Sequence, residues 1–120
     1  METNEFTFAH DAAHGWLRVP QTMLMQLKID WAISEYSYAE TTPLGDVWWL
    51  EEDCDASLFI QAYRARFACL PFIRHREDGD YSPVRNLRHV QQVVSAPFAK
   101  VMELMDHLTA KGNEACAVAA

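Results

Sequence analysis

The sequence predicts one α+β domain, with a small, mostly antiparallel sheet packed by two main helices and one short helix. Half of the 120 residues are hydrophobic and 12% are aromatic, which is enough to form a core and too much for a disordered chain. Several short stretches alternate apolar and polar residues, as half-buried strands do. Two longer stretches repeat apolar residues at helical spacing between start and stop signals.

Two hairpins are predicted in the first half of the chain. Their strands are residues 6–9 and 16–19, then 36–38 and 46–50. The second pair flanks the turn Pro43-Leu44-Gly45. Between the hairpins, Pro20 suits the first turn of a short helix, where its missing N–H costs nothing. Residues 29–34 fit neither pattern.

A long helix, a strand and a last helix are predicted next. Asp53 can cap the long helix by accepting a free backbone N–H, and Pro71 ends it. Residues 72–76 follow as a strand, and residues 84–94 are ambiguous. The last helix covers residues 95–112, beginning at a serine cap and ending at a Lys-Gly stop.

The chain is expected to form a single domain over residues 1–112 with a flexible tail at 113–120. Its opening residues lack the basic and apolar pattern of a signal peptide, and no apolar run approaches the ~20 residues that span a bilayer. Cys54, Cys69 and Cys116 contain no CxxC pair, which excludes a zinc ribbon or a redox motif of that spacing. We therefore expect a cytoplasmic protein with reduced thiols.

The net charge of −7 is unevenly distributed. Residues 1–60 contain eleven acids and two bases, whereas residues 61–90 contain six Arg and three acids. The acidic excess disfavours non-specific binding to nucleic acid or anionic lipid, because both need cations. It favours an acidic face that meets a basic partner. Ion pairing between the two regions inside the molecule is the alternative.

The densest acidic run is Glu51-Glu52-Asp53-Cys54-Asp55. Acids at a helix start offset the positive end of the helix dipole, a role that fits Asp53 and Asp55 better than Glu51 and Glu52. The run could also form a partner surface or bind a hard metal ion, although it lacks the glycine-bearing loop of an EF-hand. The carboxylates around Cys54 oppose formation of a reactive thiolate.

Two further groups of side chains carry alternative functions. His10 and His14, together with the acidic run, could form a small metal-dependent enzyme. The Arg segment 64–88 could instead bind a nucleic-acid backbone; its basic and aromatic members are Arg74, Arg76, Arg85, Arg88 and Tyr81. Pairing with neighbouring acids is the structural interpretation of the same arginines.

The Trp48-Trp49 pair lies on a predicted strand, so one ring should point inward and the other outward. The outward ring is either covered by a helix or an anchor of an interface.

Four stretches of the chain resemble a pattern in small proteins of phages, prophages and conjugative plasmids. They are His14-Gly15-Trp16-Leu17-Arg18-Val19-Pro20, Ile33-Ser34-Glu35-Tyr36-Ser37-Tyr38, Leu50-Glu51-Glu52-Asp53-Cys54-Asp55-Ala56 and Asp78-Gly79-Asp80-Tyr81-Ser82-Pro83-Val84-Arg85. The resemblance covers roughly residues 5–90 and implies an origin on a mobile element. Small acidic proteins from that source are often counter-defence factors, such as anti-CRISPR or anti-restriction proteins.

The charge pattern and the resemblance together predict a non-enzymatic inhibitor of a host defence complex. Its acidic patch would bind the basic, nucleic-acid-binding surface of a protein subunit, without cofactor, metal, membrane or direct nucleic-acid contact. The predicted contact residues are Glu35, Tyr36, Tyr38, Glu40, Asp46, Trp48, Trp49, Glu51, Glu52, Asp53 and Asp55. Reversing Glu51 and Glu52 to Lys is expected to abolish inhibition while the fold survives.

Overall fold

The structure is a computed structural model that describes residues 5–91. Its strands are β1 (Glu5–His10), β2 (Gly15–Pro20), β3 (Tyr38–Thr42), β4 (Gly45–Glu51), β5 (Phe72–Glu77) and β6 (Arg88–His89). The helices are α1 (Gln21–Gln26) and α2 (Asp55–Phe67), with 3-10 turns η1 (Asp30–Ala32) and η2 (Pro83–Asn86). The predicted helix at 95–112 and the tail lie outside the described residues.

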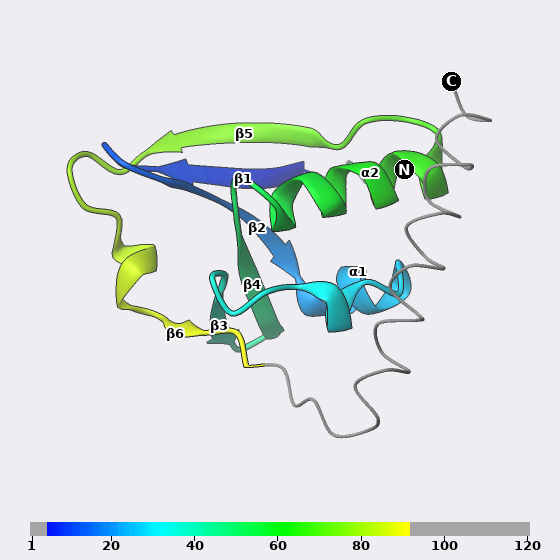
Figure 1. Cartoon of the computed structure of the whole chain (residues 1–120), viewed down its shortest axis with the longest axis horizontal. Helices are drawn as coiled ribbons and strands as arrows, with labels where there is room; N and C mark the ends of the chain where they lie inside the picture. The colour runs from blue at the N-terminus through cyan, green and yellow to red at the C-terminus, as the bar shows by residue number, and fades with distance from the viewer. Residues whose placement is uncertain (1–4, 92–120) are drawn as a thin grey trace.

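The six strands form one sheet in the order β5-β1-β2-β4-β3-β6 (Figure 1). β1 and β5 pair in parallel, and the other four pairings are antiparallel. The predicted α+β class and the mostly antiparallel sheet are therefore confirmed. Among the described residues, no helix is long and apolar enough to cross a membrane.

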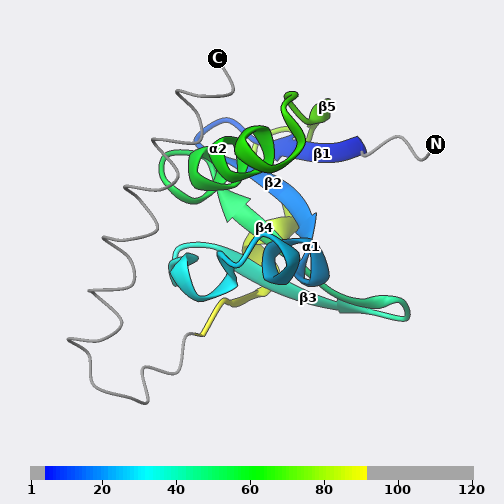
Figure 2. The same cartoon turned by 90° about the vertical axis from the view of Figure 1, so that its right-hand side faces the viewer.

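Both predicted hairpins form, and the second is displaced along the chain. β3 begins at Tyr38 rather than at residue 36, because Ser37 belongs to a turn. The Ser37 backbone N–H donates to the Ser34 carbonyl there. The β3–β4 turn projects beyond the helices in Figure 2, and Leu44 within it is fully exposed. Gly45 there has φ of 120°, which favours glycine.

One face of the sheet packs against both helices (Figures 1 and 2). Because side chains alternate along a strand, β2 and β4 each place two apolar side chains on this face. The buried cluster is formed by Phe6, Leu17, Val19, Leu24, Ile29, Ile33, Ala39, Trp48, Leu50, Ala56, Phe59, Tyr63 and Val90. Phe6 contacts the α2 rings Phe59 and Tyr63 edge-on, with centroids 5.1 and 5.7 Å apart. This face holds the main core.

The opposite face is covered by the irregular segment that follows β5. Its smaller core contains Ala9, Trp16, Trp49 and Val84. Trp49 is the outward ring of the predicted pair and is 4% exposed; it is covered by the short 3-10 helix η2 and by the Arg76 guanidinium, 5.2 Å from its ring centroid. Val84 and Leu87, from the start of the stretch 84–94 that fits no clear pattern in the sequence, thus cover this second core.

Asp11 fixes that covering segment to the sheet. Its carboxylate accepts hydrogen bonds from Arg85 Nε at 2.6 Å, Arg85 Nη2 at 2.9 Å and the Ser82 N–H at 2.9 Å. It also accepts the N–H groups of Ala13 and His14, which closes the β1–β2 turn. The Arg85 guanidinium and these N–H groups hold the pKa of Asp11 far below its usual range against the opposing effect of burial.

Candidate functional site

Glu51, at the end of β4, caps helix α2. Its side chain accepts the backbone N–H of Asp53 at 2.9 Å, of Cys54 at 2.6 Å and of Asp55 at 3.0 Å. Partial burial alone would raise the pKa of Glu51, but these three bonds and nearby His14 together hold it below its ordinary value. The prediction that Asp53 is the cap is therefore wrong, because the upstream carboxylate satisfies the free N–H groups instead.

Asp55 is an interior residue, although it was predicted to contact a partner. It is 3% exposed, and its Oδ2 accepts the Ser34 N–H at 2.9 Å, Ser34 Oγ at 2.7 Å and Ser37 Oγ at 2.5 Å. Ser37 Oγ in turn accepts the Glu51 N–H at 2.9 Å. Glu51 and Asp55 thus tie α2, β4 and the segment before β3 together, and neither carboxylate is free for a partner.

Glu52 and Asp53 are the exposed members of the acidic run. Glu52 Oε1 lies 3.6 Å from His14 Nδ1, a pair that is ionic only when His14 is protonated. The Asp53 carboxylate forms no ion pair within residues 5–91. Glu35 is also exposed, on the segment that leads to β3. The free acidic surface is therefore smaller than the run suggested.

The remaining predicted contact residues divide into exposed and occupied groups. Tyr36 is 72% exposed, whereas Trp48 and Trp49 are buried and cannot act as surface anchors. Trp49 Nε1 donates to Glu40 Oε1 at 2.9 Å, and Asp46 lies 3.8 Å from Arg88. Both acids therefore have partners within the molecule. Of this group, only Tyr36 presents most of its side chain to solvent.

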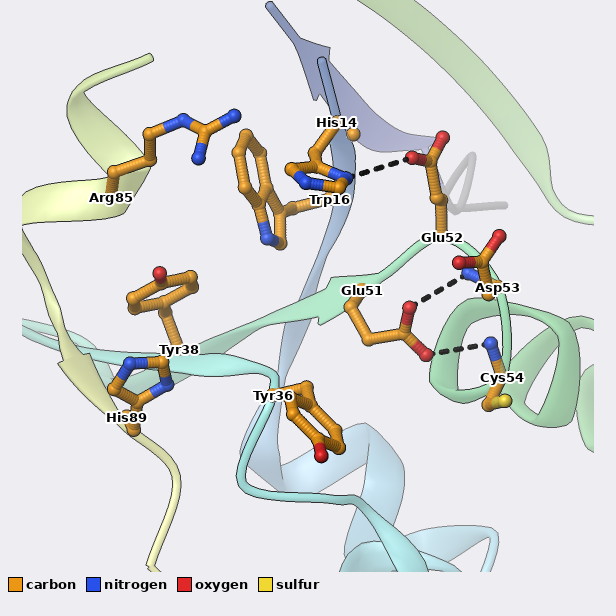
Figure 3. A pocket seen from close by; sticks show the side chains of 11 residues that line it. His14, Trp16, Tyr36, Tyr38, Glu51, Glu52, Asp53, Cys54, Arg85 and His89 are labelled. Atoms are coloured by element: carbon orange, nitrogen blue, oxygen red, sulfur yellow. Dashed lines mark hydrogen bonds and ion pairs between the residues drawn. The ribbon is translucent and has the colours of Figure 1, made fainter. Parts of the chain in front are cut away.

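An open pocket of about 460 Å³ lies where the start of β2, the end of β4 and the start of α2 meet. It is lined by His14, Gly15, Trp16, Tyr36, Tyr38, Glu51, Glu52, Asp53, Cys54, Arg85 and His89. In Figure 3 the rings of Trp16, Tyr38 and Tyr36 border one side, and the three carboxylates the other. The pocket thus unites five predicted contact residues.

Four residues that line the pocket lie outside the predicted contact surface: His14, Trp16, Arg85 and His89. Trp16 and Arg85 do occur in two of the motifs that carry the resemblance, so those motifs were the available signal. Trp16 and Arg85 meet because Asp11 binds Arg85. That contact joins residues 74 positions apart, and local sequence patterns do not encode it. His89 stacks on Tyr38 at 4.4 Å, and its Nδ1 lies 2.7 Å from the Glu35 carbonyl.

Four of the six arginines of the Arg segment form ion pairs, three of them with acids of the first half. The pairs are Arg74 with Glu5 at 2.8 Å, Arg76 with Asp78 at 2.8 Å, Arg85 with Asp11 at 2.6 Å and Arg88 with Asp46 at 3.8 Å. None of these partners belongs to the run at 51–55. Intramolecular pairing therefore explains these four arginines and leaves Glu52 and Asp53 without an arginine partner.

His10 and His14 both line a second open pocket of about 370 Å³, together with Asp11, Glu52 and His75. The His10 ring lies near those of Phe8 and His75, with both centroid distances 6.3 Å, whereas His14 turns toward Glu52. Within residues 5–91, no three His, Cys, Asp or Glu side chains are grouped so that they could hold a metal ion.

No protein-family model, curated protein sequence or solved structure matches this chain. The chemistry of the site itself is what points to a function. It offers two exposed carboxylates and an exposed phenol ring beside an open, aromatic-lined pocket. Such a surface suits a positively charged ligand or protein surface.

Proposed function

We propose that this protein is a non-enzymatic inhibitor that binds a basic surface of a bacterial defence complex and blocks nucleic acid from it. The observation that carries the proposal is the exposure of Glu52 and Asp53 beside Tyr36, at the rim of the pocket. Surfaces that bind nucleic acid present Lys and Arg to phosphates. Carboxylates fixed at suitable positions compete for those same cations.

The internal ion pairs support this direction of binding. Arg85 is held by the buried Asp11, and the exposed Arg74 and Arg88 each have an acid of the first half within 4 Å, which weakens their attraction for phosphate. The acids that stay exposed then dominate the field that a partner meets. Charges of this kind speed association and select the partner, while an exposed ring such as Tyr36 adds contact area.

The rigid attachment of the acidic pair also supports the proposal. Glu52 and Asp53 lie between the end of β4 and the start of α2, in a turn whose N–H groups are held by Glu51. A surface that is ordered before binding loses less conformational entropy when the complex forms. The resemblance to proteins of phages and plasmids supplies the class of partner, a host defence complex.

A phage-plating assay tests the inhibition. The chain is expressed in bacteria that carry single CRISPR or restriction systems, each challenged with a phage which that system restricts. The proposal predicts that plating recovers by orders of magnitude against at least one system. No recovery against any system of the panel would contradict a counter-defence role.

A binding experiment on the inhibited complex tests the blocking mechanism. The purified complex is first saturated with its nucleic acid and then mixed with the chain. We expect the bound nucleic acid to prevent association, because both ligands use the same cations. A stable ternary complex would show that the chain binds elsewhere.

A further inference from the structure

The positive features of the pocket already have anionic partners. Arg85 is held by both oxygens of Asp11, at 2.6 and 2.9 Å. The start of a helix often binds anions through backbone N–H groups that have no partner within the helix. At the start of α2, these N–H groups already donate to the Glu51 carboxylate. An anionic ligand would have to displace one of these carboxylates, so the pocket is poorly suited to a phosphate.

Two of the carboxylates and one of the rings, by contrast, are open. Glu52 has only the 3.6 Å contact with His14, and Asp53 has no ion pair within the described part of the chain. The Tyr36 ring is exposed at the rim, and Tyr38 lies deeper against His89. Carboxylates beside aromatic faces are the groups that hold an organic cation, through charge and cation–π attraction.

We infer that this pocket takes one arginine side chain from the partner surface, which rests on the proposed function. A guanidinium is planar, so it can stack on a phenol ring while its N–H fork meets carboxylate oxygens, whereas a lysine ammonium is a compact, more strongly hydrated charge. The protein uses the same stacking internally, with Arg85 5.1 Å from the Trp16 centroid and Arg76 5.2 Å from that of Trp49.

The dimensions of the pocket agree with a side-chain ligand. Its volume of about 460 Å³ lies at the lower end of the range for small-ligand sites, about 300–1,000 Å³. One arginine, with water around its fork, needs no more room. The pocket is open to solvent at the Tyr36 rim, so a side chain attached to another protein can enter it.

Titration of the isolated chain with a capped amino acid tests this inference. The probes are N-acetyl-arginine methylamide and its citrulline analogue, which keeps the shape and removes the charge. Binding is followed by NMR at the Trp16 indole N–H and the amides of residues 52–54. We expect the arginine probe to bind with a Kd of about 1 mM and the citrulline probe at least about tenfold more weakly.

Two pairs of variants locate the interaction. E52Q/D53N should weaken binding of the arginine probe at least about tenfold. D80N, a change to an exposed acid outside the pocket, should leave that binding unaltered. Y36A should weaken it about threefold, and F72A, at an exposed ring on β5, should not. Equal binding of both probes, or shifts away from Trp16 and residues 52–54, would overturn the inference.

This titration is independent of the plating assay, so the two proposals can fail separately. A chain that blocks a defence system without binding the arginine probe keeps its proposed function and loses the arginine pocket. A chain that binds the probe at residues 52–54 and blocks no system has the pocket without the function.

Discussion

Glu51 and Asp55 bind groups of the protein itself, whereas Glu52 and Asp53, which lie between them in sequence, are exposed to solvent. Each of the first two accepts three hydrogen bonds and joins two or more segments of the fold. Glu52 and Asp53 accept none of these hydrogen bonds. The density of acids in a sequence therefore does not show which carboxylates are exposed; that depends on the hydrogen bonds each one makes in the fold.

This difference changes the design of a test. Reversing Glu51 and Glu52 to Lys was expected to spare the fold, but Glu51 holds the N–H groups of the first turn of α2. A lysine there would place a cation at the positive end of the helix. Reversal of Glu52 and Asp53 removes the same charge and leaves the cap in place.

Acidification should have the largest effect, because it removes the stabilising contribution of several carboxylates at once. Asp11, Glu51 and Asp78 have folded-state pKa values below their usual ones, which are 3.8 for Asp and 4.5 for Glu. Their contribution to stability is complete above those usual values and is lost as the pH falls through the lowered ones. Urea unfolding between pH 7 and pH 2 should therefore show a decline that starts near pH 4.5.

The variant Glu51→Gln sharpens this prediction. It keeps an oxygen at the cap but cannot ionise, so the decline with falling pH should be shallower than in the unaltered protein. An identical pH dependence in both proteins would show that Glu51 does not act as a charged cap.

The next largest effect is expected from Asp55→Ala. The change leaves Ser34 and Ser37 without their buried acceptor, and we expect a loss of about 3 kcal/mol in the free energy of unfolding. The matched change Asp53→Ala should cost at most about 0.5 kcal/mol, because that side chain is exposed. Similar losses in the two variants would remove the distinction between them.

A smaller effect is expected from Glu51→Ala, which removes the cap without adding charge. Loss of a capping side chain costs about 0.5–2 kcal/mol, and α2 should fray at its first turn. Glu52→Ala serves as the control, with an expected loss of at most about 0.5 kcal/mol. Urea unfolding gives both values, and hydrogen exchange at residues 54–57 shows the fraying. Equal protection of those amides in the two variants would contradict the capping role.

Local patterns were sufficient to predict the hairpins, α2 and the α+β class, because alternation and helical spacing act over a few residues. The parallel pairing of β5 with β1 joins Phe72 to Glu5 and has no local signal. The same holds for the Asp11–Arg85 bond that places η2 over Trp49. The cap at Glu51 was missed because a residue at the end of a strand, rather than the usual cap position, supplies the oxygen.

The candidate site was predicted in part for the same reason. Glu52, Asp53 and Tyr36 are close in the fold and exposed, as the acidic-patch hypothesis requires. Trp48 and Trp49 were included because a strand must turn one ring outward, but the segment that covers that ring comes from residues 83–87. Whether a side chain that a strand turns outward is exposed in the fold thus depends on segments that are distant in sequence.

Two double charge reversals, compared in the plating assay, test most directly whether the exposed acids of the pocket cause the inhibition. E52K/D53K changes the exposed acids of the pocket, and E77K/D80K changes the net charge equally at exposed acids outside it. Both variants should stay within about 1 kcal/mol of the unaltered protein in unfolding. If the exposed acids of the pocket bind the partner, E52K/D53K loses inhibition while E77K/D80K retains it. Full inhibition by a folded E52K/D53K variant would contradict this role of the acids.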